Sequence, residues 1–308
     1  MDELLITRDL VKTYATVRAV DGVGFSLRRG EIFALLGPNG AGKTSTVRML
    51  IGQTRPDSGE IRFSSAHGPL AHVPPQELGY LPEERGLYLD QTVLRTLCYL
   101  GQLRGMSAKL AQTESLAWLK RLSLDDRAKE KVSALSKGNQ QKVQLIAAVL
   151  HKPRFAILDE PFSGFDPINQ ELALNLIREL RDGGMTVLLS AHQMQLVERL
   201  ADRILLLNRG RAVLGGTLAE LRRDAGLSQR LTLTFAAPLD AERLGVIPGV
   251  VAVERLNERQ AALLLADGAN LNQVLAALGA GAEISDVQSD AVGLHEIYLR
   301  AVGPEALA

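Results

Sequence analysis

The sequence is poor in cysteine and aromatic residues and carries no net formal charge. A single thiol, Cys98, excludes a disulfide within the chain and suits a reducing compartment. With 35 basic and 35 acidic residues, the overall charge gives no reason to expect a nucleic-acid partner. No apolar run approaches the roughly 20 residues that cross a bilayer, and the first residues, MDELLITRDL, do not read as a signal peptide. These absences favour a protein of the cytoplasm that does not enter a membrane by itself.

What the chain does have is length and apolar content. Its 308 residues, 46% of them hydrophobic, allow one large domain and one small domain, each with its own core. Short strand-like runs dominate the beginning, and helical periodicity dominates residues 89–135. Two apolar strands, FAILDEP and TVLLSAH, then alternate with helices. This order predicts an α/β fold with a mainly parallel core sheet covered by helices over residues 1–215.

The character of the sequence changes near Gly215. We expect a connector over 216–230, with a helix in TLAELRRDAGLSQ, and a small α+β accessory domain over 231–308. Its expected elements are strands at 231–235, 250–256, 261–266 and 283–288, and helices at 239–246 and 271–278. This βαββαβ order is that of a ferredoxin-like unit, followed by a closing helix in VGLHEIYLRAVG. The segment contains no cluster of chemically useful side chains.

One loop carries a phosphate-binding pattern. GPNGAGKT, from Gly37 to Thr44, satisfies G-x-x-x-x-G-K-[ST] and lies between a predicted strand and a predicted helix. Its glycines allow backbone N–H groups to approach phosphate oxygens, and the helix N-terminus attracts negative charge. Lys43 can reach the β- and γ-phosphates, and the Thr44 hydroxyl can ligate Mg²⁺. An incidental glycine turn is the alternative, but it does not account for both flanks. The loop predicts an ATP site.

Two carboxylates end the apolar strand FAILDEP. Asp159 can hold Mg²⁺, and Glu160 can orient or deprotonate an attacking water. Two acids can also simply end a strand. The phosphate loop upstream makes catalysis the stronger interpretation.

A second glycine-and-hydroxyl cluster, LSKGNQQ, stands just where another helix is expected to begin. Ser136 can cap that helix, and the free N–H groups there attract anions. Capping alone does not account for the open position at Gly138. With this cluster in place, the chain resembles an ATP-binding cassette ATPase, the nucleotide-binding subunit of an ABC transporter. In that family a signature written LSGGQ stands immediately before the strand that resembles FAILDEP.

The resemblance covers about residues 3–215 and implies a P-loop NTPase of ABC type, with an antiparallel β lobe and a helical lobe at about 89–135. It implies that two chains stack head to tail, so that each signature closes over ATP held by the other chain. It further implies Tyr14 stacking on adenine, and catalysis by Glu160 with Lys43 and the switch histidine His192. Three sets of residues follow from it: an ATP-binding set (Tyr14, Gly37, Pro38, Asn39, Gly40, Ala41, Gly42, Lys43, Thr44, Ser45), a signature set (Ser136, Lys137, Gly138, Asn139) and a dimer loop (Ser163, Gly164, Phe165, Asp166).

Two departures from the family pattern matter, one in the loop between the lobes and one in the signature. Glu83, in the loop that links the two lobes, stands where glutamine is usual. It can still ligate Mg²⁺ beside Thr44 and Asp159, but it adds negative charge near a triphosphate. Lys137 replaces a glycine of the signature, and Asn139 replaces its glutamine.

These features predict the ATP-hydrolysing subunit of an ABC transporter, using ATP and Mg²⁺. LPEERGLY, SKGNQQK and the small C-terminal domain resemble a bacterial exporter branch. We expect a homodimer, or a heterodimer with a related cassette, bound to integral membrane permease subunits at the inner face of the cell membrane, with no nucleic acid. Leu87, Tyr88, Val93 and Leu97 would either receive the permease or pack their own lobe. The alternatives are a soluble cassette ATPase acting on ribosomes or DNA, and a regulatory nucleotide switch, which the intact Glu160 disfavours.

Overall fold

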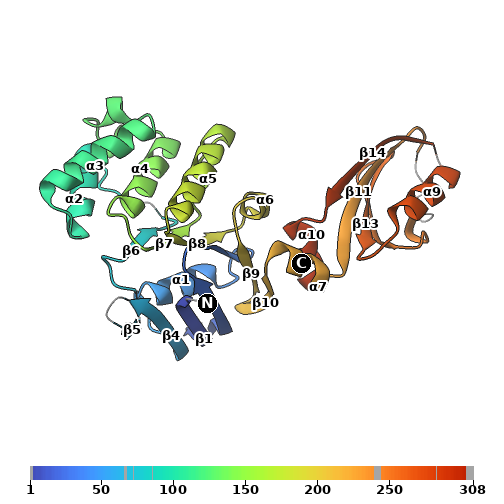
Figure 1. Cartoon of the computed structure of the whole chain (residues 1–308), viewed down its shortest axis with the longest axis horizontal. Coiled ribbons are helices and arrows are strands. Elements are labelled where there is room, and N and C mark those ends of the chain that lie inside the picture. Colours follow the sequence, from blue (N-terminus) through green and yellow to red (C-terminus); the bar gives the residue numbers. More distant parts are fainter. Residues whose placement is uncertain are drawn as a thin grey trace. The chain divides into compact units, whose positions relative to one another are not determined.

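The computed structural model describes residues 3–65, 68–71, 73–84, 86–238, 244–281 and 283–302. The chain forms two compact units, Met1–Gly215 and Gly216–Ala308 (Figure 1). In the described part of the chain, no helix combines the length and the apolar character that crossing a membrane requires.

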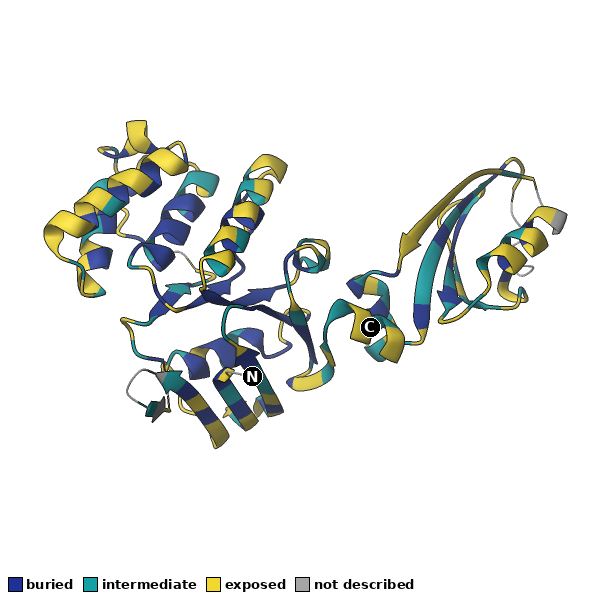
Figure 2. Ribbon diagram, viewed as in Figure 1, coloured by how far each residue is buried: buried dark blue, intermediate teal, exposed yellow. Residues whose placement is uncertain are grey.

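The first unit is built on a six-stranded sheet in the order β10-β9-β3-β8-β7-β6. Its strands are β3 (Ile32–Leu36), β6 (Leu78–Leu81), β7 (Phe155–Asp159), β8 (Thr186–Ala191), β9 (Arg203–Asn208) and β10 (Arg211–Gly216). The strands from β9 to β6 pair in parallel. Every residue of β3, β7 and β8 is buried, which is why these strands are continuous apolar runs (Figure 2). The predicted mainly parallel core sheet is confirmed.

A second sheet of the same unit is antiparallel and has the order β2-β1-β4-β5. It consists of β1 (Glu3–Tyr14), β2 (Val17–Arg28), β4 (Ser58–Ser65) and β5 (Gly68–Leu70). Its apolar side shares one core with the parallel sheet. The Phe63 ring, for example, stacks on Phe155 of β7 with centroids 6.2 Å apart. Packing of the two sheets on this core therefore positions β3, and the phosphate loop begins at the end of that strand.

Helices complete the first unit: α1 (Lys43–Leu50), α2 (Val93–Leu103), α3 (Ala108–Arg121), α4 (Lys137–Val149), α5 (Pro167–Asp182) and α6 (Met194–Glu198). The predicted helical lobe contains α2 and α3, followed by the short 3-10 helices η1 (Asp125–Arg127) and η2 (Val132–Ala134). Thr92 caps α2, and Ser107 caps α3. Val93 and Leu97 are fully buried, so they pack their own lobe.

The second unit has a four-stranded sheet in the order β12-β13-β11-β14, with every pair antiparallel. Its strands are β11 (Leu227–Phe235), β12 (Val250–Arg255), β13 (Gln260–Ala266) and β14 (Ile284–Ala291). The helices α9 (Leu271–Gly281) and α10 (Leu294–Val302) follow β13 and β14. This strand order and pairing are those of the expected ferredoxin-like unit. Most of the helix predicted at 239–246 lies outside the described residues.

The stretch 216–230, expected to hold a helix and a connector, contains α7 (Leu218–Asp224) and the first residues of β11. A capping box begins α7: Thr217 Oγ1 accepts from the Glu220 N–H, and the Glu220 carboxylate accepts from the Thr217 N–H. Leu221 and Leu227 are buried, so the stretch contributes to a core instead of only linking two domains.

Candidate active site

The phosphate loop connects β3 to α1 and is closely backed by neighbouring backbone. The Ala41 N–H donates to the Pro38 carbonyl at 3.1 Å, and Gly42 stands at the N-cap of α1 with φ +101°. A Cβ at Gly42 would lie 2.3 Å from the Ala19 carbonyl oxygen, and one at Gly37 would lie 2.4 Å from the Leu207 carbonyl oxygen. These two positions require glycine because β2 and β9 press against the loop.

A cavity of about 590 Å³ opens above this loop, a volume suited to a nucleotide. It gathers many of the predicted site residues: Asn39, Gly40, Ala41, Gly42, Lys43, Thr44, Ser45, Glu83, Asp159 and Glu160. Four other residues complete its lining: Val17, Arg18, Ala19 and Arg209. Neither the signature set nor the dimer loop belongs to this lining.

Lys43 is the buried cation of the cavity, with 7% of its surface exposed. Its Nζ donates to the Gly37 carbonyl at 2.7 Å and to the Pro38 carbonyl at 3.1 Å. Burial lowers the pKa of Lys43, while the charges of Glu160, Asp159 and Glu83 oppose that shift. An incoming phosphate would replace weak carbonyl acceptors with a charged one, which is a favourable exchange.

Asp159, the last residue of β7, is a buried carboxylate with no hydrogen-bond partner for either oxygen among the described residues. Burial raises its pKa to about 6, Glu83 and Glu160 add to the shift, and nearby Ser190 and Lys43 oppose it. A buried carboxylate without a hydrogen-bond partner is suited to bind a cation.

The cavity offers a small set of metal donors. In the parts of the chain that the structure describes, no three His, Cys, Asp or Glu side chains converge as a metal cage. Thr44, Asp159 and Glu83 nevertheless line the same cavity. One hydroxyl and one or two carboxylates fit Mg²⁺, which keeps waters and takes phosphate oxygens as further ligands.

Glu160 and His192 are brought together from the ends of neighbouring strands. His192 Nδ1 lies 2.8 Å from Glu160 Oε1, and only 7% of Glu160 is exposed. The Glu160 backbone adopts the left-handed region with φ +51°, and its N–H donates to the Ser190 carbonyl at 2.7 Å. The strained backbone turns the carboxylate away from the direction of Asp159 and toward the histidine.

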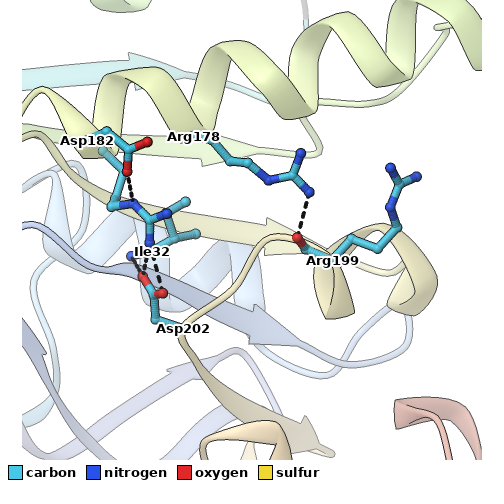
Figure 3. Close-up of polar contacts among 6 residues, drawn as sticks. Ile32, Arg178, Asp182, Arg199 and Asp202 are labelled. Carbon is cyan, nitrogen blue, oxygen red and sulfur yellow. Dashed lines mark hydrogen bonds and ion pairs between the residues drawn. The ribbon is translucent and has the colours of Figure 1, made fainter. Parts of the chain in front are cut away.

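The segment that follows His192, from α6 to the start of β9, is bound to α5 and β3 by polar contacts (Figure 3). Arg178 Nη2 donates to the Arg199 carbonyl at the end of α6 at 2.7 Å. The Arg199 guanidinium in turn binds both oxygens of Glu171 on α5. Asp202 accepts from Arg181 and from the Ile32 N–H. The position of His192 is therefore tied to the packing of α5.

The signature segment begins α4. Ser136 Oγ accepts from the Asn139 N–H at 3.3 Å, which caps the helix, and both Ser136 and Lys137 are exposed. A Cβ at Gly138 would lie 3.4 Å from the Gly164 carbonyl oxygen, so this segment lies against the dimer loop.

The dimer loop leads into α5. Asp166 caps that helix by accepting from the Asn169 N–H at 2.8 Å. Phe165, where the family usually has leucine, is buried, while Ser163 and Gly164 are exposed.

Two placements differ from a simple reading of the motifs. Tyr14 does not line the cavity; it ends β1 directly opposite Val17, which does. Gln141 was not among the predicted residues, yet its buried amide donates to the Pro161 carbonyl at 3.3 Å. It thus connects the signature helix to the turn that carries Glu160. Gln141 is the last residue of LSKGNQQ, two residues after Asn139, and this place in the motif is the signal that could have identified it.

Comparison with known proteins agrees with this geometry. Residues 20–163 match the ABC transporter family model, and residues 216–302 match the C-terminal domain of DrrA1-3-like ATP-binding proteins. An uncharacterized ABC transporter ATP-binding protein of Bacillus subtilis, YhaQ, is 36% identical over 97% of this chain and 99% of its own length. The linearmycin resistance ATP-binding protein LnrL of the same organism is 34% identical over 76% of this chain and 75% of its own length. The Nod factor export ATP-binding protein I of Ralstonia nicotianae is 36% identical over 71% of this chain and 68% of its own length.

Solved structures lead to the same family. The structure of an ATP-binding subunit of an ABC transporter is 33% identical, with a TM-score of 0.66, over 72% of this chain and 93% of that chain. Because both the sequence along its whole length and the fold agree, this chain belongs to the ATP-binding cassette family, as an ATP-binding and ATP-hydrolysing subunit of an ABC transporter.

Proposed function

We propose that this subunit drives an exporter and hydrolyses Mg-ATP in the cavity above the phosphate loop. The contact between Glu160 and His192, at the edge where Asp159 also ends its strand, is the observation that carries the proposal of hydrolysis. The names of the Nod factor export and linearmycin resistance relatives support the direction of transport.

The predicted site residues have distinct roles in this proposal. The loop N–H groups and Lys43 bind the phosphates, and Thr44, Asp159 and Glu83 hold Mg²⁺. When bound, the metal neutralises phosphate charge and fixes the geometry of the terminal phosphate. Glu160 accepts the proton of the attacking water, and a proton on His192 Nδ1, donated to Glu160, keeps the two side chains aligned.

A second copy of the chain, or a related cassette, completes the site. The signature set lies outside the lining of its own chain's cavity, and Ser136 and Lys137 are exposed. Head-to-tail dimerisation would bring the N-terminus of α4 onto the nucleotide held by the partner, where its free N–H groups favour phosphate.

The permease would bind the helical lobe. Of the four residues considered for this contact, Val93, Leu97 and Leu87 are buried, but Tyr88 is 47% exposed. Tyr88 packs edge to face on Tyr99, and Leu89 and Leu103 are also exposed. This apolar group suits a helix from a membrane subunit at the inner face of the membrane.

The test is an affinity pull-down of the Glu160→Gln chain from detergent-solubilised cells of its source organism, with and without Mg-ATP. Blocked hydrolysis should hold the closed state, so we expect ATP-dependent recovery of a polytopic membrane protein. The matched control is Lys43→Ala, which should lose both nucleotide and partner. Recovery of ribosomes or nucleoprotein without a membrane protein would replace the exporter proposal with the soluble alternative.

A further inference from the structure

The turn after β9 adds a cation to the nucleotide cavity. Arg209 follows the last residue of that strand, is exposed, and lines the cavity beside the phosphate loop. The turn is fixed to the loop, because the Gly210 N–H donates to the Ala41 carbonyl at 3.0 Å. Gly210 also lies close to Ala19, since a Cβ there would be 2.9 Å from the Ala19 carbonyl oxygen. The backbone at Arg209 is therefore held against the phosphate loop and β2.

The other cations of the cavity already have partners. Lys43 binds two loop carbonyls, and Arg18 Nε lies 2.7 Å from Asp21 Oδ1. Within the described residues, the Arg209 guanidinium makes no hydrogen bond and no ion pair. A guanidinium presents five donors in a planar fork that suits phosphate oxygens.

The order of the strands shows from which side Arg209 approaches. The phosphate loop follows β3, Arg209 follows β9 on one side of it, and His192 and Asp159 follow β8 and β7 on the other side. Parallel strands lie about 4.8 Å apart, so Arg209 and the acidic residues flank the loop from opposite sides. In the proposed site, the side of β8 and β7 holds the metal and the terminal phosphate. Arg209, on the side of β9, is therefore placed toward the α-phosphate end of the triphosphate.

We propose that Arg209 binds the α-phosphate of the nucleotide. The inference rests on the proposed ATP site and adds a binding residue to it. Because ATP and ADP share the α-phosphate, Arg209 stabilises both complexes equally and contributes nothing specific to the transition state.

The test compares Arg209→Gln with Arg211→Gln in the full-length chain. Arg211 is two residues further on, is equally exposed and pairs with Asp21, so it is a matched control. Titration calorimetry with ATP in EDTA and with Mg-ADP should show both affinities falling roughly three- to tenfold for Arg209→Gln. The KM for ATP should rise by the same factor with kcat unchanged, and Arg209→Lys should recover part of the loss.

Unchanged affinities in Arg209→Gln, or equal losses in Arg211→Gln, would overturn the inference. A loss confined to ATP would also overturn it, because the contact would then lie at the terminal phosphate. Failure of the wild-type chain to bind either nucleotide would instead overturn the proposed function.

Discussion

At the scale of single residues, the cavity is unusual in its acidity. Glu83 joins Asp159 and Glu160 in its lining. Its charge adds to the raised pKa of Asp159 and opposes the lowering of the pKa of Lys43 by burial. Glutamine, the usual residue in the family at this position, would not add this charge. Without a metal, three carboxylates repel an incoming triphosphate.

We therefore expect Glu83→Gln to tighten the binding of metal-free ATP roughly two- to fivefold and to reduce the dependence of binding on Mg²⁺. Titrations in EDTA and in Mg²⁺ measure both effects. Glu84→Gln is the control, since Glu84 is the exposed neighbour outside the cavity lining. More than tenfold slower hydrolysis in saturating Mg²⁺ would contradict this, because the contribution of Glu83 to holding the metal would then outweigh its repulsion of the triphosphate.

His151 is a second residue whose environment has a measurable consequence. Its Nε2 lies 3.0 Å from the Leu78 carbonyl, so that nitrogen carries the proton and the buried Nδ1 does not. Burial lowers the pKa of His151 to about 4; the charge of Arg104 adds to this shift, and the Leu78 carbonyl opposes it.

In the unfolded chain the imidazole takes up a second proton with a pKa near 6.5, whereas in the folded chain it does so only near pH 4. The contribution of neutral His151 to the free energy of unfolding is therefore complete above about pH 6.5 and is lost as the pH falls toward 4. We expect the melting temperature of His151→Gln to fall less than that of the wild type between pH 7.5 and pH 4.5, by roughly 3–6 °C. Scanning calorimetry over this range measures the difference, and parallel curves for the two proteins would contradict it.

At the scale of elements, α5 connects two parts of the site. Its N-terminus follows the dimer loop, and Glu171 further along it binds Arg199, which ends α6 seven residues after His192. Arg178 of α5 binds the carbonyl of the same Arg199 (Figure 3). A shift of the dimer loop on contact with a partner can thus reach the histidine through one helix.

Arg178→Ala removes the donor at the end of α6, so His192 should be less well aligned with Glu160. We expect hydrolysis to slow about two- to fivefold with the ATP dissociation constant unchanged. Phosphate release and nucleotide titration together measure this. Arg127→Ala is the control, because among the described residues Arg127 pairs only with Asp126 and Glu130, both in the helical lobe. An equal loss of ATP affinity would contradict a role limited to alignment.

At the scale of the whole molecule, each unit has its own core, since buried clusters lie within 4–207 and within 231–278. In the second unit, β14 is an edge strand with seven of its eight residues exposed. An open edge favours contact with another protein chain.

We expect a chain ending at residue 216 to fold and to bind ATP with the affinity of the full-length protein. Its ATP-dependent dimer should be weaker, as measured by light scattering with the Glu160→Gln substitution in both chains. Equal association of the truncated and full-length chains would show that the second unit does not stabilise the dimer.

The chemistry of the phosphate loop and of Asp159 was predictable from the sequence, because neighbours in the chain determine a strand, a glycine turn and a helix start. The succession of strands and helices along the second unit was predictable for the same reason. Local signals also account for the helix expected in TLAELRRDAGLSQ, because the capping box of Thr217 and Glu220 begins α7 there.

The sequence by itself therefore determined which residue types stand at the ends of β3, β7 and β8. Only the tertiary structure decided that His192 meets Glu160, that Lys43 rests on loop carbonyls, and that Arg209 lines the cavity. These contacts join residues that are far apart in the chain or belong to different loops. Their geometry depends on the order and spacing of strands in the sheet, which no local pattern of residues specifies.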